Sequence, residues 1–210
     1  MEYNLAGIRQ RVLIDKLDDD EFDPDIVDRF INDTQRSIFN QYELPFMEKI
    51  FQGTIPAGST MFKMPADISQ IQAQTIAGIP GFKDRYIPFR EFFSRYGDID
   101  NNPPSQIATW TLYGGNMVVN APTDREYVMN MFYIKKPGTL ALPGDVPEIP
   151  EEFGELLVLG AFRRIHERNE DYDLAREVDN QYYTLLNSMV ERYANRQSGT
   201  PMVMGQLNRR

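Results

Sequence analysis

Cysteine is absent from this chain of 210 residues, and histidine occurs only once, at position 166. The chain therefore has no disulfide, no thiolate metal site and no cysteine nucleophile. Neither GxxxxGK nor GxGxxG, the glycine-rich patterns that bind phosphate, is present. There is no apolar run as long as a membrane span, and the N-terminal residues lack the basic start and apolar stretch of a signal peptide. We expect a soluble protein that is made in the cytoplasm and does not contact a membrane.

Positive charge is scarce as well. Lysine and arginine number 22 against 31 aspartate and glutamate residues, which gives a formal net charge of -9. A non-specific grip on nucleic acid needs clustered cations, so this composition argues against one. The chain is nevertheless 41% hydrophobic and 12% aromatic, which is enough to bury a core.

Helical patterns are present at both ends of the chain. After a first helical segment and an acidic break, a second helix begins with Asp23 at the N-cap and Pro24 at the first helical position. It ends at Pro45, which cannot continue a helix. Its apolar residues fall on one broad face: Ile26, Val27, Phe30, Ile31, Ile38, Phe39 and Tyr42.

Two more helices are predicted after Pro147, and together they form a hairpin. The small pair Gly160-Ala161 in the first of them permits close contact with another helix. The face of this helix is formed by Phe153, Leu156, Leu157, Gly160, Ala161 and Ile165. The second helix carries a seam of Leu174, Val178, Leu185, Met189 and Tyr193.

Between the helical ends, glycine and proline are so frequent that only short segments remain, which is typical of strands. Gly114-Gly115 is expected to join two of these strands in a hairpin. The clearest strands cover residues 107–113, 117–120 and 126–134 and predict an antiparallel meander, while weaker strands are expected at 60–64 and 71–76 and a short helix at 89–96.

These segments predict an α+β fold, in which an antiparallel helical bundle of N- and C-terminal helices carries an inserted antiparallel β module and an extended C-terminal arm. The expected boundaries are residues 1–50 and 146–196 for the bundle, 51–145 for the β module and 197–210 for the arm.

A search for a reactive site finds no catalytic group. His166 begins a His-Glu-x-x sequence, but Glu170 stands where a zinc protease has its second histidine, so we expect a surface histidine at a helix C-terminus. Asp98 and Asp100 have the spacing of some metal-binding carboxylates, although a polar loop explains them more simply. The sequence therefore predicts no enzyme, no cofactor and no metal site.

Two stretches are similar to a known family. The first, from Trp110 to Pro122, reads as a strand, a glycine turn, a second strand and a proline, and it runs into a strand that ends in Lys135-Lys136-Pro137. The second runs from Pro147 to Ala161. These stretches resemble the adaptor, or connector, proteins of tailed bacteriophages, especially the podophage type with a β module inserted in a helical bundle.

The resemblance implies a structural protein of the virion neck, between the capsid portal and the tail, which is made in the host cytoplasm. It implies a homo-oligomeric ring, commonly of twelve copies, beneath the portal protein. Genomic DNA would pass through the lumen without specific binding, and tail or nozzle proteins would attach to the ring. The acidic composition suits such a channel, although solubility alone also explains it.

Two sets of residues follow as candidate contacts. Residues 197–210 are expected to be a portal-docking arm, which needs a groove on the portal or on an adjacent subunit and pairs with an exposed strand edge. Its contact residues are Met202, Val203, Met204, Leu207, Arg209 and Arg210. The acids expected to face the channel are Glu151, Glu152, Glu155, Glu167 and Glu170, and the sequence does not decide which of them lie inward.

Two other functions stay open. An aromatic-rich β module, with Trp110, Tyr113, Tyr127, Phe132 and Tyr133, is also what a carbohydrate-binding or hydrolytic tail component would use to stack sugars. Alternating aromatic residues in a strand are more often core residues, however. Another neck protein or a tail-tube protein is the remaining alternative.

Overall fold

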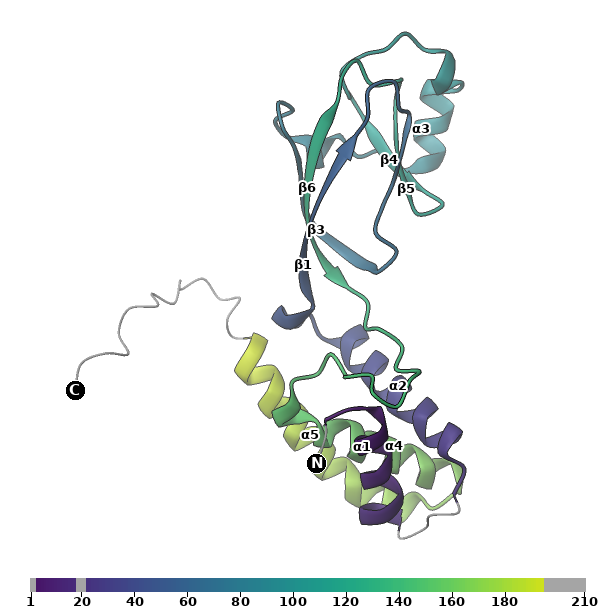
Figure 1. The fold of residues 1–210 in the computed structure, drawn as a ribbon, viewed down its shortest axis with the longest axis vertical. Helices are drawn as coiled ribbons and strands as arrows, with labels where there is room; N and C mark the ends of the chain where they lie inside the picture. The colour runs from purple at the N-terminus through teal and green to yellow at the C-terminus, as the bar shows by residue number, and fades with distance from the viewer. Residues whose placement is uncertain (1–2, 18–21, 195–210) are drawn as a thin grey trace, which may run out of the picture. The chain divides into compact units, whose positions relative to one another are not determined.

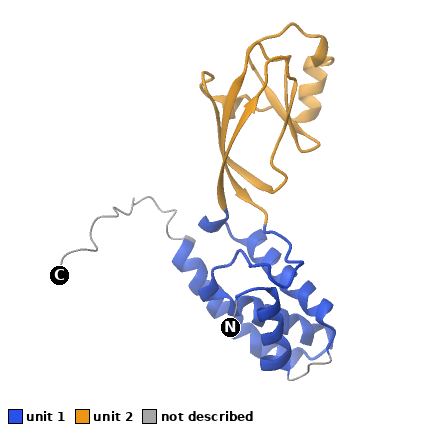
Figure 2. Ribbon diagram, in the orientation of Figure 1, with its two compact units in different colours: residues 1–47, 137–210 blue, residues 48–136 orange. Residues whose placement is uncertain are grey.

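The computed structural model describes residues 3–17 and 22–194, and the chain divides into two compact units (Figure 2). Unit 1 comprises residues 1–47 and 137–210, and unit 2 comprises residues 48–136. Helices and antiparallel sheets together confirm the expected α+β class, with helices near both ends of the chain. The extended arm expected at residues 197–210 lies outside the described residues.

Unit 1 is a helical bundle, shown in Figure 1. Asp23 accepts a hydrogen bond from the backbone N–H of Asp25, and Pro24 follows it as the first helical residue, so this helix begins where the sequence predicts. The helices of unit 1 are α1 (Leu5–Gln10), which continues as a π-helix (Arg11–Leu17), α2 (Pro24–Gln41), α4 (Glu155–Arg168) and α5 (Tyr172–Ala194), with short 3₁₀ turns at Pro45–Met47 and Glu151–Phe153.

The N-terminal half of helix α4, from Leu156 to Ala161, is buried on all sides, which the one-sided apolar face expected from the sequence does not describe. Val158 and Leu159, outside that face, are buried as well as Leu156 and Leu157. The cause is that α4 packs against α2, against α5 and against the N-terminal helical segment. A helical segment that is hydrophobic all round, as Leu156 to Ala161 is, needs such a central position.

Helix α5 packs on α4 through a seam that differs from the predicted one by a small rotation. Leu174, expected in the seam, is 43% exposed, whereas the neighbouring Ala175 is buried. The buried residues of α5 are Ala175, Val178, Tyr182, Leu186 and Met189.

Unit 2 contains two three-stranded antiparallel sheets and one short helix. The first sheet has the strand order β1-β6-β3 and the second has the order β2-β5-β4. The elements are β1 (Glu48–Ile55), β2 (Met61–Lys63), β3 (Ile68–Ile76), α3 (Phe89–Tyr96), β4 (Trp110–Tyr113), β5 (Asn116–Val119) and β6 (Tyr127–Lys135), with 3₁₀ turns at Phe82–Arg85 and Ile99–Asn101.

The predicted meander is only half right. Gly114 and Gly115, both with positive φ, do join β4 and β5 in a hairpin. The third expected strand, β6, pairs instead with β1 and β3 in the other sheet. Its alternate residues Tyr127, Met129, Met131 and Tyr133 are buried in a core shared with β5, and this burial opposite the second sheet determines its place.

The sequence pattern does not predict strand β1, since it places residues up to Ile50 in the helical bundle. It begins at Glu48, directly after the 3₁₀ turn that contains Pro45. Its partner β6 lies about eighty residues further along the chain, so no local pattern identifies the pairing.

Candidate functional site

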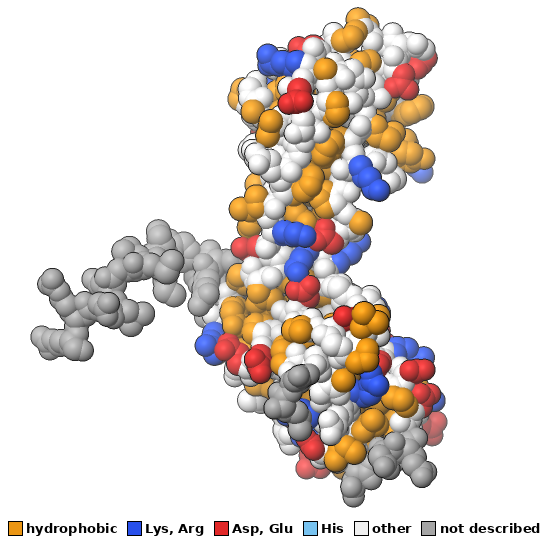
Figure 3. All heavy atoms as spheres, in the orientation of Figure 1, with side chains coloured by type: hydrophobic (Ala, Val, Ile, Leu, Met, Phe, Trp, Pro, Cys, Tyr) orange, Lys and Arg blue, Asp and Glu red, His pale blue; other side chains and the backbone are white. Residues whose placement is uncertain are grey.

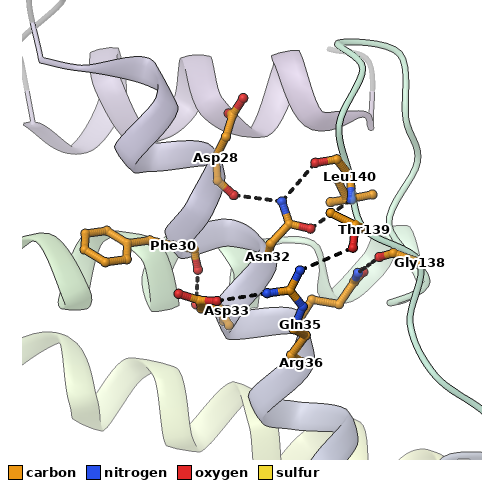
Figure 4. A network of polar contacts seen from close by, with 10 residues as sticks. Asp28, Phe30, Asn32, Asp33, Gln35, Arg36, Gly138, Thr139 and Leu140 are labelled. Carbon is orange, nitrogen blue, oxygen red and sulfur yellow. Dashed lines mark hydrogen bonds and ion pairs between the residues drawn. The ribbon is translucent and has the colours of Figure 1, made fainter. Parts of the chain in front are cut away.

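The chain returns from unit 2 to unit 1 along helix α2, and buried polar side chains hold it there (Figure 4). Asn32 makes a reciprocal pair with Leu140: its Nδ2 donates to the Leu140 carbonyl at 2.9 Å, and its Oδ1 accepts from the Leu140 N–H at 2.8 Å. The same Nδ2 also donates to the carbonyl of Asp28. One buried amide thus satisfies both backbone groups of a residue that carries no secondary structure.

Gln35 and Arg36 extend this contact along the helix. Gln35 Nε2 donates to the Gly138 carbonyl at 3.0 Å, while Gln35 Oε1 accepts from the Glu148 N–H at 3.0 Å. Arg36 donates to Thr139 Oγ1 and to Asp33. The sequence pattern does not predict this contact, because it describes α2 by its apolar face alone. What the sequence does offer as an indication of their burial is that Asn32 and Gln35 lie next to the apolar face of α2.

Asp145 completes the connection by holding a tight loop and the start of α1. Its Oδ2 accepts from the N–H groups of Leu142 and Ala141 at 2.8 and 2.7 Å. These hydrogen bonds, that from Leu142 first, lower the pKa of the Asp145 carboxyl below its ordinary value. The Asp145 carbonyl in turn accepts from the N–H of Leu5, the first residue of α1.

The acids Glu151, Glu152 and Glu155 lie at the N-terminal end of α4. Glu155 is half-buried and ion-paired with Arg11 and with Lys16, the latter at 3.2 Å. Glu152 accepts from Tyr193 Oη at 2.8 Å and pairs with Arg192 at 3.2 Å. Carboxylates at the N-terminal end of a helix also interact favourably with the helix dipole. Stabilisation of the bundle therefore explains the presence of Glu152 and Glu155 without a role in a channel.

Glu151 is the acid of this group with an exposed side chain and no ion pair among the described residues. It lies near Tyr3, whose hydroxyl donates to the Ile149 carbonyl at 2.5 Å. Burial and, secondarily, the charge of Glu151 raise the pKa of Tyr3.

Glu167 and Glu170 lie at the opposite end of α4, about 20 Å away for a helix of 14 residues. Glu167 pairs with Arg163 at 3.3 Å, and Glu170 occupies the turn before α5 with a positive φ of 62°. The five expected channel acids therefore form two separate groups rather than one patch.

His166 is less exposed than expected. Its side chain is 13% exposed, packs edge-on against Phe162 and lies 3.5 Å from Asp171. The ring is therefore only partly at the surface, because Phe162 one turn earlier packs against it. The position of His166 in the last turn of α4 is as predicted.

Asp98 and Asp100 do not converge on a shared point. Asp98 accepts from Asn101 at 2.5 Å, and Asp100 accepts from Thr60 Oγ1 at 2.7 Å. Within residues 3–17 and 22–194, no group of three or more His, Asp or Glu side chains has an arrangement that suits a metal ion. Both aspartates thus serve to order the loop around the 3₁₀ turn Ile99–Asn101.

The aromatic side chains of the β module are mostly core residues. Trp110, Tyr127 and Tyr133 are buried, and the Trp110 ring stacks on Phe82 at 5.3 Å. Tyr113 is 56% exposed, but one face of its ring is covered by Phe89 at 4.2 Å. No flat row of exposed rings is available for sugars among these residues.

An exposed apolar groove of about 450 Å³, which no pattern in the sequence predicts, lies beside α3 in unit 2. Met61 and Phe93 on its walls are 51% and 56% exposed. Figure 3 shows hydrophobic side chains at the surface of unit 2 on the side where α3 lies. Exposed apolar surface of this kind is typical of contact sites.

The residues expected to form the portal-docking arm, Met202, Val203, Met204, Leu207, Arg209 and Arg210, lie outside the described residues. In the part of the chain that the structure covers, no helix is both long enough and apolar enough to cross a membrane.

No curated protein matches the chain. A family model described as SU10 adaptor protein matches residues 3–210, which confirms the resemblance to phage adaptors. With nearly its whole length matched, the chain belongs to the SU10 adaptor protein family of bacteriophage structural proteins.

Proposed function

We propose that this protein forms a head-to-tail ring in the virion neck, seated beneath the portal, with tail or nozzle proteins attached to it. The observation that carries the proposal is the adaptor family match over residues 3–210. As the resemblance to phage adaptors implies, the proposed ring has twelve copies and surrounds the path of the genome.

The charge of the chain supports a channel that does not bind DNA. A net charge of -9 repels phosphate. Of the five candidate channel acids, Glu151 and Glu170 have no ion pair among the described residues, so they contribute the least compensated negative charge. We propose that one of these two ends of α4 faces the lumen.

A structural role also accounts for the chemistry of the side chains better than catalysis does. Most of the polar groups described above bind backbone groups or neighbouring charges, as Asn32 and Glu155 do. The burial of Trp110, Tyr127 and Tyr133 removes the main support for a sugar-binding tail component.

Electron microscopy of the full-length protein with and without the portal protein of the same phage tests the proposal. We expect rings seated on one end of the portal, and the free protein serves as the comparison. A protein that does not join the portal under any condition, and that is missing from the neck of purified virions, would contradict the proposed function.

A DNA-binding measurement tests the channel separately. Duplex DNA should show no tight binding to the assembled ring at physiological salt. Tight binding with a steep dependence on salt concentration would overturn the idea of an acidic channel wall. Comparing E151Q/E152Q with E167Q/E170Q would show which end of α4 matters, because only the inward-facing pair should increase DNA retention.

A further inference from the structure

Strand β1 is an open edge of the first sheet of unit 2. It pairs with β6 without interruption from Glu48 to Ile55. On its other side, no backbone group of β1 forms a hydrogen bond to any described residue. Natural proteins usually protect such an edge with a bulge, a proline or several charges. Residues 50–55 of β1 have none of these.

The other strand edges of unit 2 are protected. β3, on the far side of the same sheet, has irregular register at two points, and Lys83 Nζ donates to its Gln72 carbonyl. β4 receives a hydrogen bond at Trp110 from the Ile87 N–H, and β2 is only three residues long. Of the described strands, β1 is therefore the long edge that is left free.

The side chains of β1 indicate what kind of segment fits beside it. Ile50 is 76% exposed, more than any other large hydrophobic residue of the described chain. From Ile50 to Ile55 the strand carries no charge, and Glu48 at its start has no ion-pair partner among the described residues. A matching strand would be uncharged and partly apolar, with a cation at the end that lies beside Glu48.

The C-terminal residues of this chain have that pattern. Met202 to Leu207 are uncharged and mostly apolar, and two arginines, Arg209 and Arg210, end the chain. Pro201 directly precedes them, and proline suits the start of a strand better than its interior. In an antiparallel arrangement Arg209 lies opposite Glu48, and the same register places Leu207 opposite Ile50 and Met202 opposite Ile55.

We propose that β1 accepts residues 202–209 of a neighbouring copy as an additional antiparallel strand, which links adjacent subunits. The inference rests on the proposed ring. Of the two partners that the sequence left open for the C-terminal arm, the portal and an adjacent subunit, it selects the adjacent subunit. Backbone hydrogen bonds supply the attachment, while the Ile50 and Glu48 contacts select the register.

The absence of cysteine allows a direct test. In the double variant I50C/L207C, mild oxidation of rings assembled on the portal should produce a ladder of covalently linked copies on a non-reducing gel. A reducing agent should return the ladder to monomer. A second pair in the same register, Q52C/G205C, should give the same ladder.

The matched control is A73C/L207C, with an exposed cysteine on the protected edge strand β3, which should give no ladder. The inference fails if rings form but neither pair cross-links, if the control cross-links equally, or if the disulfide closes within one chain. Linkage of the Leu207 cysteine to the portal instead would also overturn it. Failure to form rings at all would count against the proposed function, which microscopy of the same sample detects.

Discussion

Gly160 of α4 lies directly against Thr34 of α2: a Cβ atom added to the glycine would lie 2.8 Å from Thr34 Oγ1 and 3.1 Å from Thr34 Cβ. Real side chains are not found this close, so the two helices approach each other only because residue 160 has no side chain. The sequence prediction that Gly160 permits close helix contact is thus confirmed.

Gly160→Ala should destabilise the protein by about 1–3 kcal/mol, because overpacking outweighs the better helix propensity of alanine. Denaturant or thermal unfolding measures the effect. Gly144→Ala is the control, since no atom lies within 4 Å of its added Cβ. In G160A/T34A the loss should be smaller than the sum of the single losses. Equal stability of G160A and the unmodified protein would contradict the packing described.

Asn32→Ala should destabilise unit 1 by about 2–4 kcal/mol, since it leaves the buried N–H and carbonyl of Leu140 without partners. Asn40→Ala, on the exposed face of the same helix, should change the free energy of unfolding far less. Urea unfolding of both variants measures the two changes. Similar losses of unfolding free energy in the two variants would show that the hydrogen bonds between Asn32 and Leu140 contribute little.

Asp145→Asn should have an effect that depends on pH. Because the folded pKa of Asp145 is lowered, its charge stabilises the fold above the pKa of an unfolded aspartate, about 3.9. That contribution is lost as pH falls through the lowered folded pKa. The difference in unfolding midpoint between the two proteins should therefore be largest near neutrality and should vanish in acid. A gap that stays constant down to strongly acidic pH would refute this assignment.

Alanine at Asp98, Asp100 or His166 should leave assembly with the portal intact, because the sequence predicts no catalytic or metal-binding role for these side chains. His166→Ala should lower stability by about 1 kcal/mol through lost packing on Phe162. Elemental analysis of the purified protein should find no stoichiometric metal. One zinc or manganese ion per chain that is lost in any of these variants would show instead that these residues bind a metal.

Local signals in the sequence predicted the elements that they control. Asp23 and Pro24 start α2, and Gly114-Gly115 turn the β4–β5 hairpin, because capping and positive φ act within a few residues. Contacts between distant segments were not predictable in this way. The partner of Asn32 lies 108 residues away, and the choice of β6 between two sheets depends on the assembled core.

The candidate site shows the same division. Composition identified the acids of α4, but only the fold shows that Glu155 is paired with Arg11 and Lys16 while Glu151 is not. The apolar groove beside α3 brings together residues from separate segments, Met61, Phe93 and Tyr113 among them. No single stretch of sequence marks it.

Unit 2 begins and ends close to neighbouring strand positions, since its first residue, Glu48, pairs in the β1–β6 ladder with Ile134, and its last residue is Lys136. Paired residues of an antiparallel ladder have Cα atoms about 5 Å apart, a span that a two-residue turn can bridge. The β module therefore begins and ends at neighbouring positions of one ladder. We expect that a short turn or a different domain can replace it without a change in the length of the helices, so the bundle can serve as a scaffold on which evolution, or a designer, exchanges the inserted part.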